Sequence, residues 1–289
     1  MDNRIIGLIG LGIMGGAIAR NLAERGWHVV GFDIDTTRAA DVLGGGIEIA
    51  PDIAGVVAAA PIIMTSLPSP AAALAVAQEI AAATETGRIV AELSTLSLAD
   101  KFQFKAALDR AGHVALDCPL SGTGAQAEAR DLIVYASGDS AAITTCKSVF
   151  ADFAKRDVNL GPYGNGSRMK FIANHLVAIH NVAAAEAMLL AERAGLDLNQ
   201  VVDVIAPGAG GSRMFQMRAP MMAAGTYTPA TMKVSNWAKD MAIIAAFANG
   251  FGCETPLFTL TQPIYAKALA NGLGEMDTAA VFEVLKAGS

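Results

Sequence analysis

The sequence contains little charge and few aromatic residues. Only 17% of its 289 residues are Asp, Glu, Lys or Arg, 6% are aromatic, and the net charge is −6. Lys and Arg form no cluster, so nucleic acid and anionic membranes are not expected as partners, because both require concentrated positive charge. Of all its residues 53% are hydrophobic, a composition typical of a well-packed globular protein rather than a disordered chain.

Cysteine is scarce as well. The chain has three, Cys118, Cys146 and Cys253, and both their odd number and their wide spacing argue against a disulfide framework or a zinc site. We therefore expect no metal and a reducing compartment. A predicted strand begins at Arg4, which leaves no room for a signal peptide, so we expect a cytoplasmic protein.

Long uninterrupted hydrophobic runs are absent, although the mean hydropathy is high at +0.41. The most apolar stretch, residues 53–67, contains Pro61 and is followed by Pro68 and Pro70. A helix that crosses a bilayer of about 30 Å needs roughly 20 consecutive apolar residues. This stretch is too short and too interrupted, so we expect no membrane partner.

The first half of the sequence alternates short β-rich runs with helical stretches. Alternation of this kind predicts parallel strands joined by crossover helices, and therefore a doubly wound α/β domain. A run at 132–136, followed by Gly138-Asp139, is interpreted as a later strand of the same sheet. The other strands are predicted at 4–9, 28–32, 61–66, 88–93 and 113–116.

The second half is predicted to be helical throughout. A long helical pattern covers 167–194 and ends at Gly195, and no convincing strand follows Gly161. We expect two domains, an α/β domain over 1–161 and an all-α domain over 162–289, since a domain typically has about 100–200 residues. Further helices are predicted at 198–205, 232–249, 257–269 and 278–286.

A glycine-rich turn follows the first predicted strand and opens a helix; it reads Gly10-Leu11-Gly12-Ile13-Met14-Gly15. In a dinucleotide site the first glycine makes the tight turn, the second lets the backbone approach a pyrophosphate, and the third lets helix and strand pack closely. The anion then lies on the N-terminus of the helix. The alternative is a glycine turn required only for packing.

Asp33 lies 18 residues after Gly15, at the end of the second predicted strand. An acid at this place accepts hydrogen bonds from the hydroxyl groups of an adenosine ribose. Its carboxylate would repel a 2′-phosphate, and Ile34 offers no positive charge, so NAD is favoured over NADP. Arg38 is close enough in sequence to keep NADP possible.

Several further motifs resemble those of the β-hydroxyacid dehydrogenase family. They are Glu92-Leu93-Ser94-Thr95, Asp117-Cys118-Pro119-Leu120-Ser121-Gly122, Gly161-x-x-Gly164-x-Gly166-x-x-x-Lys170-x-x-x-Asn174 and Lys239-Asp240. The resemblance extends from the N-terminus to about Thr261. Within the family, the segment 212–218 is most similar to the L-threonate dehydrogenase branch, although Arg213 stands where that branch usually has Trp.

The resemblance implies a Rossmann-type domain, a long interdomain helix and an all-α domain that builds a homodimer or homotetramer. It places the active site in the cleft between the domains and implies short, anionic 3-hydroxy acids as substrates. The sequence departs from the family pattern at Thr123, where a second glycine is usual, at Arg130, which replaces a later glycine, and at Ala173.

Lys170 and Asn174 are the predicted catalytic residues. They are four positions apart in a helical stretch and so share one face of it. Lysine is a poor base at its ordinary pKa, but desolvation beside a positively charged nicotinamide would lower the pKa of Lys170 toward the range that suits a general base. Asn174 can hydrogen-bond both the substrate hydroxyl and the lysine. The alternative for Lys170 is an ordinary solvated lysine.

Ser121, Gly122 and Thr123 are predicted to bind the substrate carboxylate through hydroxyl and backbone N–H groups, although Ser-Gly is also a common turn pair. Lys239 is expected near the nicotinamide or the substrate, with a solvated lysine at a helix end as the alternative. Polar and turn residues that follow later strands are expected to line the cofactor, because dinucleotides bind at that edge of the sheet; they are Leu67, Pro68 and Thr95.

Two other functions remain open from the residues alone. An imine reductase shares the implied architecture, but such enzymes generally lack the catalytic lysine. A non-catalytic dinucleotide-binding scaffold would not need Lys170 and Asn174. The sequence therefore favours an NAD(P)-dependent oxidoreductase that acts on the CH–OH group of a short 3-hydroxy acid.

Overall fold

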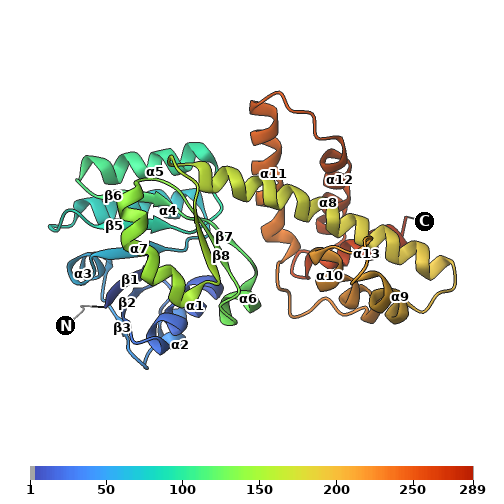
Figure 1. Ribbon diagram of the computed structural model, residues 1–289, viewed down its shortest axis with the longest axis horizontal. Coiled ribbons are helices and arrows are strands. Elements are labelled where there is room, and N and C mark those ends of the chain that lie inside the picture. The colour runs from blue at the N-terminus through green and yellow to red at the C-terminus, as the bar shows by residue number, and fades with distance from the viewer. Residues whose placement is uncertain (1–3, 289) are drawn as a thin grey trace. The chain divides into compact units, whose positions relative to one another are not determined.

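The computed structural model describes residues 4–288 and divides into two compact units (Figure 1). The first unit ends at Lys170 and the second begins at Phe171. The helix that contains both of these residues, α8 (Asn165–Arg193), is 29 residues long and belongs to both units. No helix within residues 4–288 has the length and hydrophobicity that a membrane crossing requires.

A six-stranded sheet forms the centre of the first unit, with strand order β3-β2-β1-β4-β5-β6 and only parallel pairs. The order reverses between β1 and β4, which is where doubly wound sheets bind ligands beyond the carboxyl ends of their strands. The expected α/β doubly wound fold is confirmed. The strands are β1 (Ile5–Ile9), β2 (His28–Phe32), β3 (Ile47–Ile49), β4 (Ile62–Thr65), β5 (Ile89–Glu92) and β6 (Val114–Asp117).

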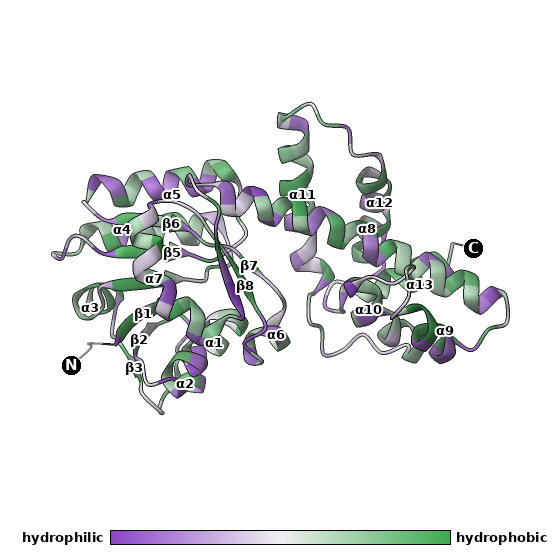
Figure 2. Ribbon diagram, in the orientation of Figure 1, coloured by the Kyte–Doolittle hydropathy of each residue, from purple (hydrophilic) through white to green (hydrophobic). Residues whose placement is uncertain are grey.

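Helices cover both faces of this sheet because successive strand residues point to opposite sides. Leu8 packs into a cluster with residues of α1 and α7, whereas its neighbour Ile9 packs with residues of α3, α4 and α5. Hydrophilic and hydrophobic segments alternate along α5, as expected for a helix with one buried face (Figure 2). The helices are α1 (Ile13–Glu24), α2 (Thr36–Val42), α3 (Ile53–Ala59), α4 (Pro70–Ala82), α5 (Leu98–Arg110) and α7 (Ser140–Phe153).

The run at 132–136 does form a strand, β8 (Ile133–Ala136), but its assignment to the main sheet was wrong. β8 lies in a separate three-stranded sheet, between β7 (Leu120–Ser121) and β9 (Arg156–Asn159). Within the described residues, a single antiparallel bridge, Asp117–Ser137, joins the ends of β6 and β8. A short apolar run indicates a strand but carries no information about its partner, which explains the error.

The second unit is helical. Among residues 171–288 the only β pairing is the isolated bridge between Lys233 and Asp277. One of its helices, α10, was not expected from the sequence. The helices that follow α8 are α9 (Leu198–Ile205), α10 (Arg213–Ala224), α11 (Val234–Gly250), α12 (Pro256–Ala270), η1 (Thr278–Ala280) and α13 (Val281–Lys286).

Candidate active site

The glycine turn joins β1 to α1, and its glycines serve different purposes. A Cβ atom on Gly10 would lie 2.2 Å from the Ser66 carbonyl oxygen, and one on Gly15 would lie 1.9 Å from the Gly10 carbonyl oxygen. Packing alone therefore requires these two glycines. A Cβ on Gly12 would meet only Arg38 Nη1, at 3.7 Å, so packing does not explain this third glycine.

Gly12 is also the N-cap of α1, and no side chain among residues 4–288 caps that helix. Helices α2 to α5 and α7 each begin with a capping Asp or Ser side chain. The first N–H groups of a helix favour an anion, and no side chain in the described part of the chain takes that place here. The turn therefore fits a pyrophosphate.

Asp33 lies directly after β2 and faces this turn. Its Oδ2 accepts a hydrogen bond from the Leu11 N–H at 2.7 Å, and its Oδ1 accepts one from the Asp35 N–H at 2.8 Å. Two backbone donors thus fix the carboxylate beside the turn. Arg38, at the start of α2, pairs with Asp35 at 3.3 Å and is exposed.

The segments after β4 and β5 are joined at the same edge of the sheet. Ser94 Oγ accepts a hydrogen bond from the Leu67 N–H at 2.8 Å, and Leu67 Cδ2 lies 3.4 Å from the Cβ position of Gly10. Leu67 therefore adjoins the glycine turn, and Pro68 and Thr95 are the next residues along the chain in their respective loops. Four strand ends thus bring the predicted cofactor residues of the first unit together.

The predicted substrate segment begins at the end of β7 and leads into α6 (Gly124–Glu128). Gly122 has a φ of +139°, and a Cβ there would lie 2.5 Å from Leu132 Cδ2, so only glycine fits. A Cβ on Gly124 would lie 2.6 Å from Ile13 Cγ2, which places α6 against the glycine turn. The substrate and cofactor segments are therefore neighbours within the first unit.

The two departures near this segment have structural explanations. Thr123 is the N-cap of α6 and forms a capping box with Gln126, whose Oε1 accepts the Thr123 N–H at 3.1 Å. Arg130 follows α6 with a φ of +56°, a conformation that favours glycine, and its side chain pairs with Glu24 of α1. Thr123 starts the helix, and Arg130 occupies a position that suits the glycine of the family pattern.

Lys170 lies in the second turn of α8, and its side chain is buried, with 8% of the residue exposed. The start of α8 packs closely against the ends of β6 and β8. A Cβ on Gly166 would lie 2.2 Å from the Tyr135 carbonyl oxygen and 2.6 Å from that of Asp117. Gly166 is therefore required for α8 to approach the carboxyl edge of the sheet.

A buried charged cluster beneath this contact was not expected from the sequence. Lys101 of α5 pairs with Glu92 at the end of β5 and, at 2.9 Å, with Asp117 at the end of β6; all three residues are fully buried. Burial alone lowers the pKa of Lys101, but the two carboxylates outweigh it and hold the pKa well above its ordinary value. Lys101, Phe104 and Leu108 are at positions i, i+3 and i+7 of α5 and so lie on one face of the helix. This spacing was the one feature of the sequence that indicated the burial of Lys101.

The second unit holds the other predicted polar residues on two helices. Asn174 of α8 donates through Nδ2 to Asp240 Oδ2 of α11 at 3.0 Å, and both residues are buried. Lys239 Nζ lies 3.6 Å from Asp240 Oδ1, and its side chain is 40% exposed. Asp240 therefore contacts both Asn174 and Lys239.

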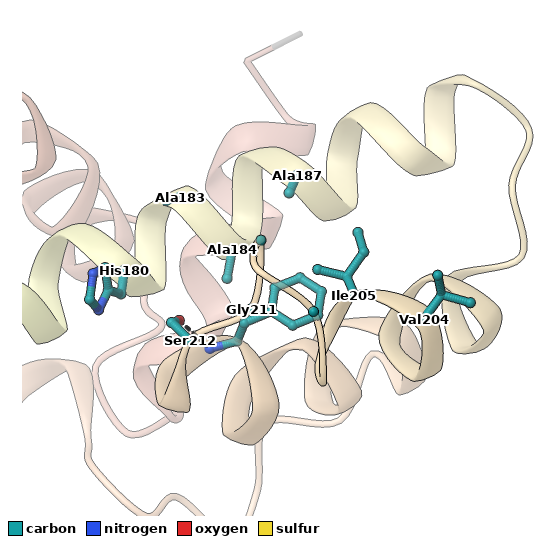
Figure 3. Close-up of a pocket in the computed structure, with 11 residues that line it drawn as sticks. His180, Ala183, Ala184, Ala187, Val204, Ile205, Gly211 and Ser212 are labelled. Carbon is teal, nitrogen blue, oxygen red and sulfur yellow. Dashed lines mark hydrogen bonds between the residues drawn. The ribbon is translucent and has the colours of Figure 1, made fainter.

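The second unit also has a cavity of 570 Å³ between α8, α9 and the start of α10 (Figure 3). Alanine and other apolar residues dominate its lining, together with His180 and Ser212. None of the predicted catalytic or binding residues lines it, so it is separate from the candidate site.

Comparison with known proteins gives two family matches that together cover almost the whole chain. Residues 5–163 match the family described as the NAD binding domain of 6-phosphogluconate dehydrogenase. Residues 164–285 match the family described as the NAD-binding domain of NADP-dependent 3-hydroxyisobutyrate dehydrogenase.

Individual relatives are similar over their full lengths. The L-threonate dehydrogenase of Cupriavidus necator is 31% identical over 98% of this chain and 96% of its own. Glyoxylate/succinic semialdehyde reductase 1 of Arabidopsis thaliana is 28% identical over 97% of this chain and 98% of its own. The crystal structure of 3-hydroxyisobutyrate dehydrogenase from Salmonella typhimurium superposes with a TM-score of 0.88 at 31% identity, over 97% of this chain and 99% of that one.

Proposed function

We propose that this chain, which belongs to the β-hydroxyacid dehydrogenase family of NAD(P)-dependent oxidoreductases, interconverts a short 3-hydroxy carboxylic acid and its oxo form. Lys170 would act as the general acid and base. One observation carries the proposal. The first turn of α8 is hydrogen-bonded to the end of β6, and Lys170 follows one turn later. This supports a position for Lys170 at the sheet edge that holds the glycine turn.

We assign cofactor binding to the strand ends of the first unit. The uncapped N-terminus of α1 would hold the pyrophosphate, and the fixed carboxylate of Asp33 would accept the ribose hydroxyl groups. The nicotinamide, when bound, takes or returns the hydride. Asp33 supports NAD over NADP, because a 2′-phosphate would lie beside its negative charge. The assigned residues are Gly10, Leu11, Gly12, Ile13, Met14, Gly15, Asp33, Leu67, Pro68, Thr95 and Lys239.

Ser121, Gly122 and Thr123 would bind the substrate carboxylate, together with Lys239. The adjacency of α6 and the glycine turn supports this assignment, because the acid must lie next to the cofactor. The Ser121 hydroxyl and the backbone N–H groups after it can donate to a carboxylate. Thr123 is already engaged in the capping box, so its contribution would come from the backbone and from the width of the pocket.

In the direction of oxidation, Lys170 would accept the proton of the substrate hydroxyl and so prepare the carbon for loss of its hydrogen. Asn174, one helical turn further along α8, would hold the hydroxyl oxygen in place. Its Nδ2 donates to Asp240, and the amide also has an oxygen that can accept a hydrogen bond. In the direction of reduction, Lys170 would return the proton to the carbonyl oxygen.

We divide the work of the chain into a cofactor domain over 1–161 and a substrate and oligomerisation domain over 162–289. The second unit exposes large hydrophobic side chains, among them Leu190, Val204, Leu257 and Leu260. Such surfaces mark contacts between proteins, which supports a homodimer or homotetramer built by this unit. The three free cysteines suit a reducing cytoplasm.

The test of the reaction is the reduction of NAD at alkaline pH with threonate, 3-hydroxyisobutyrate, serine and glycerate. Lys170→Ala is expected to lower kcat by about 10²–10⁴, the usual share of general acid–base catalysis, while leaving NADH binding measured by fluorescence unchanged. Lys155→Ala, at an exposed lysine in the first unit, is the matched control and should keep full activity. Retained kcat in Lys170→Ala would remove the proposed base, and no turnover with any of the four acids would remove the substrate class.

A further inference from the structure

The start of α8 is capped by residues from distant parts of the chain rather than by its own preceding residue. The Ser167 N–H donates to Asp117 Oδ2 at 2.7 Å, and the Ser167 hydroxyl donates to Asp117 Oδ1 at 2.8 Å. The Gly166 N–H donates to the Ser137 hydroxyl at 2.9 Å. N–H groups in the first turn of a helix have no partners within it, and a carboxylate is their best acceptor because the helix dipole also favours it.

Asp117 is itself held from the other side. Lys101 Nζ lies 2.9 Å from Asp117 Oδ1 and also pairs with Glu92 Oε2. The Ser137 hydroxyl lies 3.2 Å from Asp117 Oδ2, and the Tyr163 hydroxyl donates to the Lys101 carbonyl oxygen at 2.9 Å. The position and the orientation of the Asp117 carboxylate are therefore both determined. Because the first turn of α8 donates to this carboxylate, the position of that turn is determined as well.

Glu92 connects the same cluster to the cofactor side. Its second oxygen, Oε1, accepts the Ser94 N–H at 2.9 Å, and Ser94 Oγ in turn accepts the Leu67 N–H at 2.8 Å. One continuous set of hydrogen bonds thus runs from the loops after β4 and β5, through Glu92, Lys101 and Asp117, to the first turn of α8.

We propose that the buried Glu92–Lys101–Asp117 cluster is a positioning device that sets Lys170 relative to the cofactor-facing loops. The proposal rests on the function proposed for Lys170. None of the three residues is exposed, so none can touch substrate, and they act only through α8 and the loops. Lys170 follows Ser167 by three residues, so a shift of the first turn displaces the amine directly.

The experiment compares two changes at this cap. Ser167→Ala keeps the backbone hydrogen bond and removes the hydroxyl, and we expect kcat to fall about tenfold, as for one lost hydrogen bond to a charged group. Asp117→Asn places an amide N–H₂ against either Lys101 or the Ser167 donors, and we expect a loss of about a hundredfold, the size typical of a misplacement by about 1 Å. Ser167→Thr restores the hydroxyl and should recover most of the kcat lost in Ser167→Ala.

Two readouts separate positioning from mere stability. In both variants the KM for NAD should stay within about twofold while kcat falls, and the acid limb of the pH profile of kcat/KM, which reports the base, should move. Asp139→Ala is the matched control, since Asp139 caps α7 through the Ala142 N–H at 2.8 Å and α7 carries no predicted site residue. Loss of this cap should lower the melting temperature without changing kcat or the pH profile.

The outcomes are distinct. Full kcat and an unmoved pH profile in Ser167→Ala, beside an inactive Lys170→Ala, would overturn the positioning role and leave the proposed reaction intact. If Asp117→Asn does not fold, Ser167→Ala and Ser167→Thr decide the question alone. An active Lys170→Ala would instead overturn the proposed function on which this inference rests.

Discussion

The two units of the chain hold their polar site residues by different means. In the first unit, Asp33, Glu92 and Asp117 stand at the ends of parallel strands, and each carboxylate accepts at least one backbone N–H group. In the second unit, Asn174, Lys239 and Asp240 stand on two helices, and the contacts that join them run between side chains.

This difference has a physical consequence. A strand-end carboxylate bonded to backbone N–H groups is part of the folded framework, so its loss should lower stability and activity together. A side chain held by another side chain on a helix can be exchanged with little change to the backbone. The polar residues at the strand ends of the first unit are therefore expected to tolerate fewer changes than those on the helices of the second.

The largest expected effect concerns the first unit, where buried carboxylates are bonded to the backbone. Lys101→Met removes the cation between two buried carboxylates, and breaking a buried ion pair in this way costs roughly 3–5 kcal/mol. Lys105→Met, one turn along the same helix, removes a part-exposed pair with Asp109 and a cation–π contact with the Tyr163 ring, and should cost about 1 kcal/mol or less. Urea unfolding of both variants measures the difference, and equal losses would contradict the structural role of the cluster.

Next in size is a change on the helical side. Asp240→Asn keeps an oxygen that can accept from Asn174 but removes the negative charge beside Lys239. We expect kcat/KM to fall about tenfold while the free energy of unfolding changes by less than about 1 kcal/mol. Asp203→Asn, at an exposed acid on α9, is the control and should change neither quantity. A large loss of stability in Asp240→Asn would contradict the expectation that side chains on the helices of the second unit can be exchanged with little effect on the fold.

A smaller effect concerns one histidine in each unit. Burial lowers the pKa of His113, whose Nδ1 accepts the Arg88 N–H at 3.2 Å, and burial also lowers the pKa of His175, which stacks on Phe258. Folding thus favours the neutral rings, so their stabilising contribution is complete above the ordinary pKa of 6.5 and is lost as the pH falls below it.

The urea midpoint should therefore decrease between pH 7.5 and pH 5.5. His113→Gln should reduce this dependence more than His175→Gln, because protonation of His113 also breaks its bond to the backbone. If His175→Gln instead reduced the pH dependence more than His113→Gln, the stacking of His175 on Phe258 would favour the neutral ring more strongly than the hydrogen bond of His113 to the Arg88 N–H.

The smallest expected effect is a gain. Arg130→Gly removes an L-residue from the left-handed conformation, which costs about 1 kcal/mol, and loses a part-exposed ion pair with Glu24 worth less than that. Stability should rise by up to about 1 kcal/mol with no change in kcat. Arg130→Ala loses the pair but keeps the strain and should be less stable than wild type; thermal melts of the two variants distinguish these effects.

The sequence predicted those parts of the fold and site that local patterns determine. The glycine turn, the strand that precedes it and Asp33 have fixed spacing, so their positions along the chain are enough to place them together. Helix α10 was not predicted, and its internal Pro220 is not the reason, since α12 was predicted despite Pro263. The run at 132–136 was assigned to the wrong sheet because its pairing depends on the distant β7 and β9.

The charged cluster could not be found by the same reasoning. Its members lie on α5 and at two strand ends, and in the sequence Lys101 is one of several charged residues in an ordinary amphipathic helix. Its interaction with two carboxylates depends on the pairing of β5 with β6, which brings Glu92 level with Asp117. Residues whose contacts depend on long-range pairing were therefore missed, whereas Asp33 could be placed beside the glycine turn from its spacing.

The capped start of α8 also has a consequence for synthesis on the ribosome. The N–H and hydroxyl donors that complete the hydrogen bonding of Asp117 come from Ser167, fifty positions further along the chain. During synthesis these donors leave the exit tunnel only after every strand of the parallel sheet, so Asp117 cannot be fully hydrogen-bonded until the beginning of α8 has emerged. Lys170 emerges three residues later, so the segment that completes the hydrogen bonds of the first unit also carries Lys170.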